Sequence, residues 1–294
     1  MTYPQYRKAL LIAVFFFLPS CTLLHSTLTE PVNQDGVAIS SIGFVKISRP
    51  NDFIQTYLKS DVDAKIESHS SLTIYIEGDG AAWLGRSIPP SNPTPKQSLG
   101  AFLASQDSSA TLAYLGRPCQ YLDAEKLAHC PSKFWTDGRF SEEVIALSNQ
   151  AIDRLLQKLQ ILSNSKVLSK KINLVGYSGG GALATLIASS RTDVRCLVTI
   201  AAPLDTQAWT QLQQIAPLHS SLNPAAPSKN LLTIKQSHWF GVKDLIVPPA
   251  SLGNYLANNG STQTQIQTLS TANHFQPWVE EWPKIMSKTC LKSP

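Results

Sequence analysis

A glycine-flanked serine between an apolar segment and a small-residue segment constrains the fold of this chain most. The motif Gly-Tyr-Ser-Gly-Gly occupies residues 176–180, after the apolar residues 172–175 and before the helical stretch 182–188. This is the setting of a nucleophile elbow, a turn so sharp that residues two positions from the serine must lack bulky side chains. Gly176 and Gly180 meet that requirement. The motif therefore predicts Ser178 exposed at a helix N-terminus, where developing negative charge is stabilised.

Along the rest of the chain, apolar segments typical of strands alternate with segments typical of helices. With 43% hydrophobic and 15% charged residues, the 294-residue chain has enough apolar side chains for a large core. A helix is predicted to begin at Ser141, with acidic residues in its first turn and apolar residues at helical spacing. This order implies an α/β fold, with a mostly parallel central sheet and helices on both faces. The predicted strands are residues 72–76, 111–115, 172–175, 196–201, 231–234 and 264–269.

With this elbow, the chain resembles the α/β-hydrolase fold family over about residues 40–290. The family places its catalytic groups in the order serine, acid, histidine. The resemblance implies Asp244, in a Lys-Asp-Leu-Ile-Val-Pro loop, as the acid and His274, just after the last predicted strand, as the base. A serine hydroxyl is a poor nucleophile at neutral pH, so His274 would take its proton while Asp244 holds the imidazole.

Other residues compete for these roles. Asp205 lies at the end of the strand after Ser178, where some lipases of this fold place their acid, and it stays an alternative to Asp244. His238 is the nearest rival to His274, but it lies in the segment that leads to Asp244. The remaining histidines are more simply surface or packing residues: His25, His69, His129 and His219.

Acyl transfer also needs donors for the oxyanion of the tetrahedral intermediate. The backbone N–H of Gly179 is one expected donor. The second is expected from the Glu-Gly-Asp-Gly segment 77–80, at the N–H of Asp79 or alternatively Gly80. Two carboxylates near an oxyanion are unfavourable unless they are paired or turned away, and Arg86 or Arg117 could pair them.

A closer resemblance is to a group of bacterial, lipobox-bearing α/β hydrolases. It rests on the Tyr-Ile-Glu-Gly-Asp-Gly segment 75–80, on the Leu-Gly-Arg-Pro-Cys-Gln-Tyr segment 115–121, and on His274 followed by Trp278. This resemblance spans most of the chain and implies no particular substrate.

The N-terminus resembles a bacterial lipoprotein signal. Arg7 and Lys8 precede the apolar run 9–18, and Leu-Pro-Ser-Cys at 18–21 resembles a lipobox. The resemblance implies that residues 1–20 are removed, that Cys21 is acylated, and that Thr22 directs the protein to the outer membrane. We expect residues 21–40 to be a tether. The hydrolase domain would then comprise residues 41–294.

The other four cysteines are predicted to form two disulfides, because export places them in an oxidising compartment. Cys119 and Cys130 would brace the loop after the strand 111–115. Cys196 lies near the start of its strand, and a helix running down the sheet after His274 would deliver Cys290 to that end. Their spacing does not match a metal site, so no metal is expected.

These features together predict a serine hydrolase that cleaves a carboxylic ester or thioester. The substrate would be a small-molecule or lipid acyl ester, and the lipid anchor would hold the protein on the membrane. The alternative is a non-catalytic binding or structural lipoprotein on a hydrolase scaffold. No cofactor is expected, since the chain has neither a dinucleotide fingerprint nor a P-loop. A net charge of +5 is too weak to indicate nucleic acid. The oligomeric state stays open.

Overall fold

The computed structural model describes residues 29–32, 35–60, 71–81, 88–162 and 171–292. Within these residues, eight strands form one sheet in the order β1-β2-β4-β3-β5-β6-β7-β8. β1 and β2 run antiparallel to their neighbours, and the sheet is parallel from β4 to β8. The strands are β1 Val45–Lys46, β2 Thr56–Ser60, β3 Leu72–Ile76, β4 Thr111–Leu115, β5 Ile172–Tyr177, β6 Val194–Ile200, β7 Lys235–Gly241 and β8 Thr264–Leu269.

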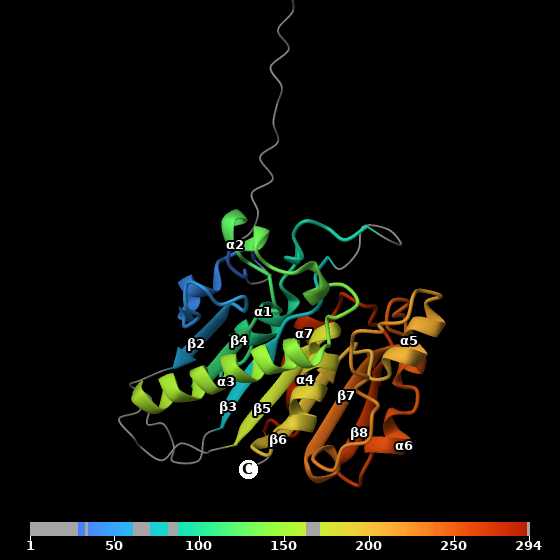
Figure 1. The fold of residues 1–294 in the computed structure, drawn as a ribbon. Helices are drawn as coiled ribbons and strands as arrows, with labels where there is room; N and C mark the ends of the chain where they lie inside the picture. Colours follow the sequence, from blue (N-terminus) through green and yellow to red (C-terminus); the bar gives the residue numbers. More distant parts are fainter. Residues whose placement is uncertain (1–28, 33–34, 61–70, 82–87, 163–170, 293–294) are drawn as a thin grey trace, which may run out of the picture.

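Helices cover both faces of this sheet, as the alternating pattern predicts. In Figure 1, α3 and α4 lie in front of the sheet and α1 and α7 lie behind it. The helices are α1 Leu99–Ser105, α2 Ala124–Ala128, α3 Glu142–Leu162, α4 Gly179–Ser190, α5 Thr206–Leu212, α6 Tyr255–Asn259 and α7 Trp278–Met286. Short 3₁₀ turns are η1 Ile39–Ile42, η2 Ser132–Phe134, η3 Leu231–Thr233 and η4 Pro249–Leu252.

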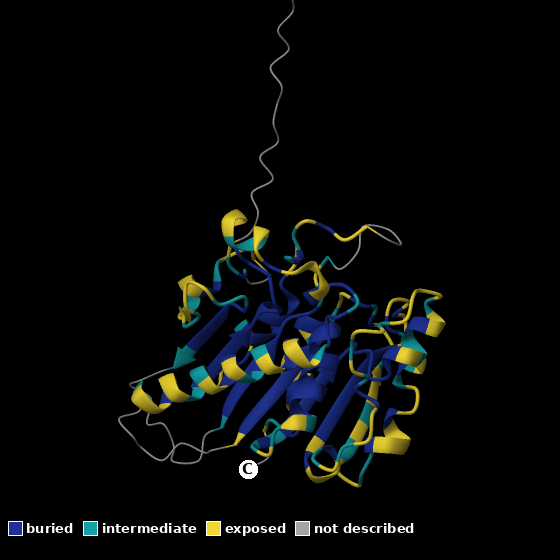
Figure 2. Cartoon of the chain, in the orientation of Figure 1, coloured by how far each residue is buried: buried dark blue, intermediate teal, exposed yellow. Residues whose placement is uncertain are grey.

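The core consists of two apolar layers, one on each side of the sheet. Alternation along the strands divides their side chains between the layers. In β3, for example, Ile74 packs in the layer of α3 and α4, whereas Tyr75 packs in the layer of α1 and α7. Trp278 and Trp282 of α7 are fully buried. Figure 2 shows how burial changes across these layers: the central strands are buried and the outer side of α3 is exposed.

One predicted strand is wrong. Residues 231–234 contain the 3₁₀ turn η3, and the strand is β7, Lys235–Gly241. The polar residues Gln236, Ser237 and His238 are buried in β7, so the strand lacks an apolar run. Their cost of burial is offset by hydrogen bonds. His238 Nδ1 lies 2.8 Å from Thr199 Oγ1, and Gln236 Oε1 lies 3.0 Å from His238 Nε2.

The described part of the chain includes residues of the predicted tether. Among residues 35–40, Ile39 is completely buried in the core layer of α1 and α7, whereas most of its neighbours are exposed. Its N–H donates to Pro31 O at 3.1 Å, and Val32 forms a bridge with Ala38. Cys21 and the predicted signal peptide lie outside the described residues. Among the helices that the structure describes, none is both long and apolar enough to cross a bilayer.

Both predicted disulfides are present in the structure. Cys119 and Cys130 are joined with their Cα atoms 5.9 Å apart, and Cys196 and Cys290 with theirs 5.7 Å apart. The second bridge ties the end of the chain after α7 to β6, as the expected direction of α7 implies.

Candidate active site

The turn between β5 and α4 has the geometry of a nucleophile elbow. Ser178 adopts φ 51° and ψ −126°, a conformation that a residue with a side chain rarely takes. A Cβ atom on Gly176 would lie 2.3 Å from the carbonyl oxygen of Gly180, and one on Gly180 would lie 2.3 Å from that of Glu77. The two positions that the motif analysis requires to be small are therefore in direct contact with backbone.

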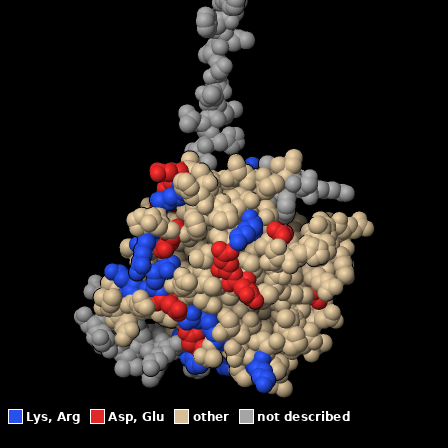
Figure 3. Space-filling view, in the orientation of Figure 1, with Lys and Arg blue, Asp and Glu red and all other residues tan. Residues whose placement is uncertain are grey.

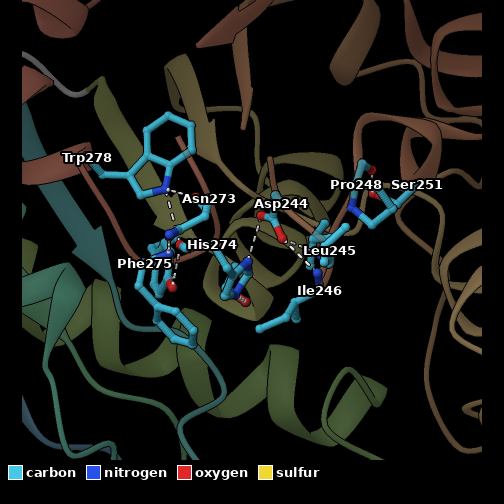
Figure 4. A network of polar contacts seen from close by, with 12 residues as sticks. Asp244, Leu245, Ile246, Pro248, Ser251, Asn273, His274, Phe275 and Trp278 are labelled. Carbon is cyan, nitrogen blue, oxygen red and sulfur yellow. Dashed lines mark hydrogen bonds and ion pairs between the residues drawn. The ribbon is translucent and has the colours of Figure 1, made fainter. Parts of the chain in front are cut away.

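Three side chains from separate segments form a hydrogen-bonded chain at this turn. His274 Nε2 lies 3.0 Å from Ser178 Oγ, and His274 Nδ1 lies 2.8 Å from Asp244 Oδ2. Ser178 follows β5, Asp244 follows β7 and His274 follows β8, so all three lie at the carboxyl edge of the parallel sheet. Figure 4 shows Asp244 and His274 on their two loops. The structure thus brings together the serine, acid and histidine that the resemblance implies.

Asp244 is oriented by its own loop. The carboxylate is buried, and its Oδ1 accepts hydrogen bonds of 2.8 Å from the backbone N–H groups of Ile246 and Val247. These two bonds leave Oδ2 to face the imidazole of His274. The acid is therefore held in place independently of the histidine.

His274 is oriented through its backbone. Its carbonyl oxygen accepts hydrogen bonds from Tyr177 Oη at 3.0 Å and from Trp278 Nε1 at 3.1 Å. Figure 4 shows the Trp278 indole nitrogen directed at this segment. The rings of Tyr177 and Phe275 also pack near the imidazole, with centroids 5.3 Å and 5.2 Å from it. Sequence reasoning noted Trp278 but missed Tyr177, although it is the residue directly before Ser178.

Asp205 has a different position and different partners. It is the N-cap of α5, and its Oδ1 accepts from the backbone N–H groups of Gln207 and Ala208 at 3.1 Å. Its Oδ2 accepts from Asn254 N at 3.0 Å, which joins α5 to the segment after η4. Burial raises the pKa of Asp205, but these hydrogen bonds outweigh burial and hold it below its ordinary value. Asp244, and not Asp205, contacts His274.

The other histidines lie away from Ser178 where the structure describes them. His238 is fully buried in β7, and burial lowers its pKa to about 3, so it is neutral. His129 ends α2, and His219 lies in the segment after α5. His25 and His69 fall outside the described residues.

The segment 77–80 lies against the elbow, as the oxyanion hypothesis requires. A Cβ atom on Gly78 would lie 3.5 Å from Ser178 Cβ, and one on Gly179 would lie 2.0 Å from Asp79 Oδ1. Asp79 and Gly179 are therefore immediate neighbours beside Ser178. A side chain at position 179 would collide with the Asp79 carboxylate.

Two arginines neutralise Asp79. Arg117 Nη1 lies 2.6 Å from Oδ1 and Arg139 Nη1 lies 2.9 Å from Oδ2, with side chains only 3% and 4% exposed. Burial alone would raise the pKa of Asp79, but the two guanidinium groups hold it below its ordinary value. Arg117 is one of the two partners expected from the sequence, and Arg86 lies outside the described residues. Arg139 was missed, because nothing in its local sequence links it to residue 79.

Glu77 is turned away instead of paired. Its Oε1 accepts from the N–H groups of Gly78 and Gly100 at 2.9 Å and 3.1 Å, and its Oε2 accepts from Tyr114 Oη at 2.9 Å. Burial raises the pKa of Glu77. Its carboxylate therefore supports the start of α1, and only the paired Asp79 lies next to Gly179.

The loop after β4 supports this segment and carries one disulfide. Gln120 Nε2 donates to Gly78 O at 2.9 Å, and Arg117 Nη2 donates to Arg139 O at 2.6 Å. The Cys119–Cys130 bridge joins the loop to the chain after α2. Within the described part of the chain, no cluster of three or more His, Cys, Asp or Glu side chains could hold a metal ion.

Comparisons with known proteins identify the fold. No protein-family model matches the chain, and no curated protein matches its sequence. VinJ is 12% identical at a TM-score of 0.52, covering 83% of this chain and 95% of that one. A Pyrococcus furiosus esterase is 10% identical at a TM-score of 0.50, and the match covers 90% of this chain and 98% of the esterase. A Pyrococcus horikoshii acylaminoacyl peptidase is 11% identical at a TM-score of 0.53, and the match covers 83% of this chain and 40% of the peptidase. With the strand order, these matches show the α/β-hydrolase fold.

Proposed function

We propose that this protein is a serine hydrolase that cleaves a carboxylic ester or thioester through an acyl-enzyme. The observation that carries the proposal is the continuous chain of contacts from Ser178 through His274 to Asp244. In the first step, Ser178 Oγ attacks the acyl carbon while His274 Nε2 takes its proton. Asp244 holds Nδ1 protonated and stabilises the imidazolium. His274 then protonates the leaving alcohol or thiol, and water releases the acid by the same route.

The oxyanion is assigned to the backbone N–H groups of Gly179 and Asp79. These residues are neighbours beside Ser178, and the Gly179 N–H belongs to the first turn of α4. The carboxylate of Asp79 would oppose an oxyanion if it were unpaired. Its contacts with Arg117 and Arg139 cancel that charge and fix the residue whose N–H is needed. Among the fold's neighbours, the Pyrococcus furiosus structure is an esterase, which supports ester chemistry on this scaffold.

The anchoring proposal rests on the N-terminal sequence. We assign residues 1–20 as a cleaved signal and Cys21 as the lipid-bearing residue, which places the protein in the cell envelope, on the outer membrane. The two disulfides are compatible with export. A Cys21→Ser protein should lose metabolic fatty-acid label and remain an uncleaved precursor. Processing at residue 21 and release as soluble protein would contradict the lipid assignment.

The hydrolase proposal is tested with p-nitrophenyl esters of increasing chain length and a fluorophosphonate probe. Ser178→Ala should lower turnover about 10⁴–10⁶-fold and abolish labelling, because the attacking oxygen is gone. Ser287→Ala is a matched control, since that hydroxyl lies at the exposed end of α7 and donates to Lys284 O. Labelling that survives in Ser178→Ala would contradict the nucleophile assignment. A wild type without turnover or labelling would favour the non-catalytic alternative.

A further inference from the structure

Two long segments around the site carry no charged residue. Residues 206–228 and 245–279 contain no Asp, Glu, Lys or Arg, although such residues make up 15% of the chain. These segments include α5, η4, α6 and β8, together with the loop that holds His274 and the part of the Asp244 loop that follows Asp244; the exposed Lys243 lies just before the second segment. In Figure 3 the part of the surface over α5, β7 and β8 is almost free of charge, whereas charged side chains gather over the rest of this view.

Large apolar side chains are exposed on this uncharged part. We call five of them the apolar rim: Leu212, Ile215, Leu245, Ile246 and Phe275, which are 49%, 42%, 84%, 43% and 55% exposed. Exposed apolar residues that gather in one region, instead of lying scattered singly, mark a contact surface.

The apolar rim borders the catalytic residues. Phe275 packs edge-on against the His274 ring, and Leu245 follows Asp244 directly. Trp209 Nε1 donates to Ile246 O and Gln213 Nε2 donates to Leu245 O, both at 2.8 Å. α5 and the Asp244 loop are therefore bound together, so four rim residues lie on adjoining segments, and Phe275 lies on the loop of His274, which contacts Asp244.

The first described residues lie at the same edge of the sheet. Glu30 Oε1 accepts a hydrogen bond of 2.8 Å from Ser40 Oγ, so the first described residues lie beside η1. Burial and the charge of Lys126 lower the pKa of Lys46 in β1, while the charges of Glu30 and Asp123 act in the opposite direction. Asp123 caps α2, and α2 follows the carboxyl end of β4. Figure 1 shows the first described residues beside α2, at the end of the molecule where α5 also lies.

The distance from the proposed anchor to this edge is short. Nine peptide steps separate Cys21 from Glu30. A fully extended chain spans at most about 3.3–3.6 Å per residue, so the acylated cysteine holds Glu30 within about 30 Å of the bilayer. Glu30 is near the β1–β2 side of the carboxyl edge and the apolar rim is near its β7–β8 side, with Ser178 between them.

We propose that the apolar rim rests on the lipid bilayer to which Cys21 is anchored, and that the substrate is an acyl ester of a lipid in that bilayer. This inference rests on the proposed hydrolase function and on the proposed acylation of Cys21. An uncharged rim inserts among lipids without requiring anionic headgroups. Ser178 Oγ then bonds to the acyl carbon as the ester C–O bond breaks, the alcohol takes the proton from His274, and water releases the fatty acid.

The test compares two substrates on the full-length protein. One is a long-chain p-nitrophenyl ester in phosphatidylcholine vesicles, and the other is the soluble p-nitrophenyl acetate. The double variant Leu212→Gln/Ile215→Gln should lower the vesicle rate at least about tenfold and leave the soluble rate within about twofold. Ile161→Gln is the matched control, because Ile161 is 70% exposed near the end of α3, on the opposite edge of the sheet. It should change neither rate.

The outcomes separate the two proposals. Unchanged vesicle rates in the double variant, or an equal loss on both substrates, would overturn the bilayer contact while the hydrolase function stands. Hydrogen exchange gives a readout that does not depend on activity: amides of residues 206–215 and 242–247 should exchange more slowly on vesicles. Equal exchange with and without vesicles overturns the inference, even for an inactive protein. Protection that appears without lipid as protein concentration rises would show contact between copies instead.

Discussion

Replacing Asp79 by Asn should destabilise the protein strongly. Asp79 is the shared partner of two arginines whose side chains are only 3% and 4% exposed. The variant keeps the shape of the side chain but leaves two buried guanidinium groups facing each other without a counter-charge. Removing one partner of a buried ion pair typically costs about 3–5 kcal/mol. For a domain of this size, about 2–4 °C of melting temperature is lost per kcal/mol, so a fall of about 6–20 °C is expected.

A matched ion pair on the surface provides the control. Asp153 contacts Arg191 at 2.8 Å, but its side chain is 55% exposed. Exposed pairs contribute about 0.2–1 kcal/mol, so Asp153→Asn should lower the melting temperature by less than about 4 °C. Thermal unfolding of both variants at pH 7, followed by circular dichroism with the disulfides intact, measures the difference. If Asp79→Asn melts no lower than Asp153→Asn, the reasoning from burial is refuted.

Asp79→Asn should also slow catalysis, and it should change how the stability of the protein depends on pH in acid. Loss or displacement of one oxyanion donor typically lowers kcat about 10²–10³-fold. Because the pKa of Asp79 is held below its ordinary value, its stabilisation is present above about pH 4 and is lost as pH falls below that value. Asp79→Asn should therefore be less sensitive than wild type to acid in that range. The variant keeps the Asp79 N–H, so a kcat equal to that of wild type would contradict the idea that the contacts with Arg117 and Arg139 hold that N–H in place.

Two further predictions follow from the site. Asp244→Asn should lower kcat about 10⁴-fold by favouring the wrong tautomer of His274. Asp205→Asn keeps a cap oxygen for α5 but puts an amide NH₂ where Oδ2 accepts from Asn254 N, so it should cost about 1–3 kcal/mol of stability and keep most activity. The reverse ranking in kcat would return the acid role to Asp205. Burial lowers the pKa of His238 to about 3 in the fold, against about 6.5 in the unfolded chain, so protonation favours the unfolded chain and the free energy of unfolding falls with a progressively steeper slope as pH drops below about 6.5. Denaturant titrations between pH 5 and 6.5 should show this slope in wild type and not in His238→Gln, and an equal slope in both would assign it to other groups.

Local sequence patterns were sufficient to predict the elbow and most strands of the sheet. Gly176 reflects a steric requirement within the motif, because a Cβ atom there would meet the carbonyl oxygen of Gly180, whereas Gly180 is also required by the approach of Glu77 from the neighbouring strand. The short apolar strands are buried on both faces. β7 was misplaced because its buried side chains are polar, and part of what satisfies them comes from another strand, such as Thr199 for His238. A hydrophobicity pattern cannot register a hydrogen bond to another strand.

The sequence by itself determined where the sharp turn is, which residues follow each strand, and the α/β order of the fold. Only the tertiary structure decided which of two aspartates reaches His274, and that Arg139 shares Asp79 with Arg117. The turn is recognisable because Ser178 and the glycines that flank it are neighbours along the chain. The choice of acid and the ion pair depend on the paths of loops that are separated by many residues in sequence, and the packing of the whole sheet sets those paths.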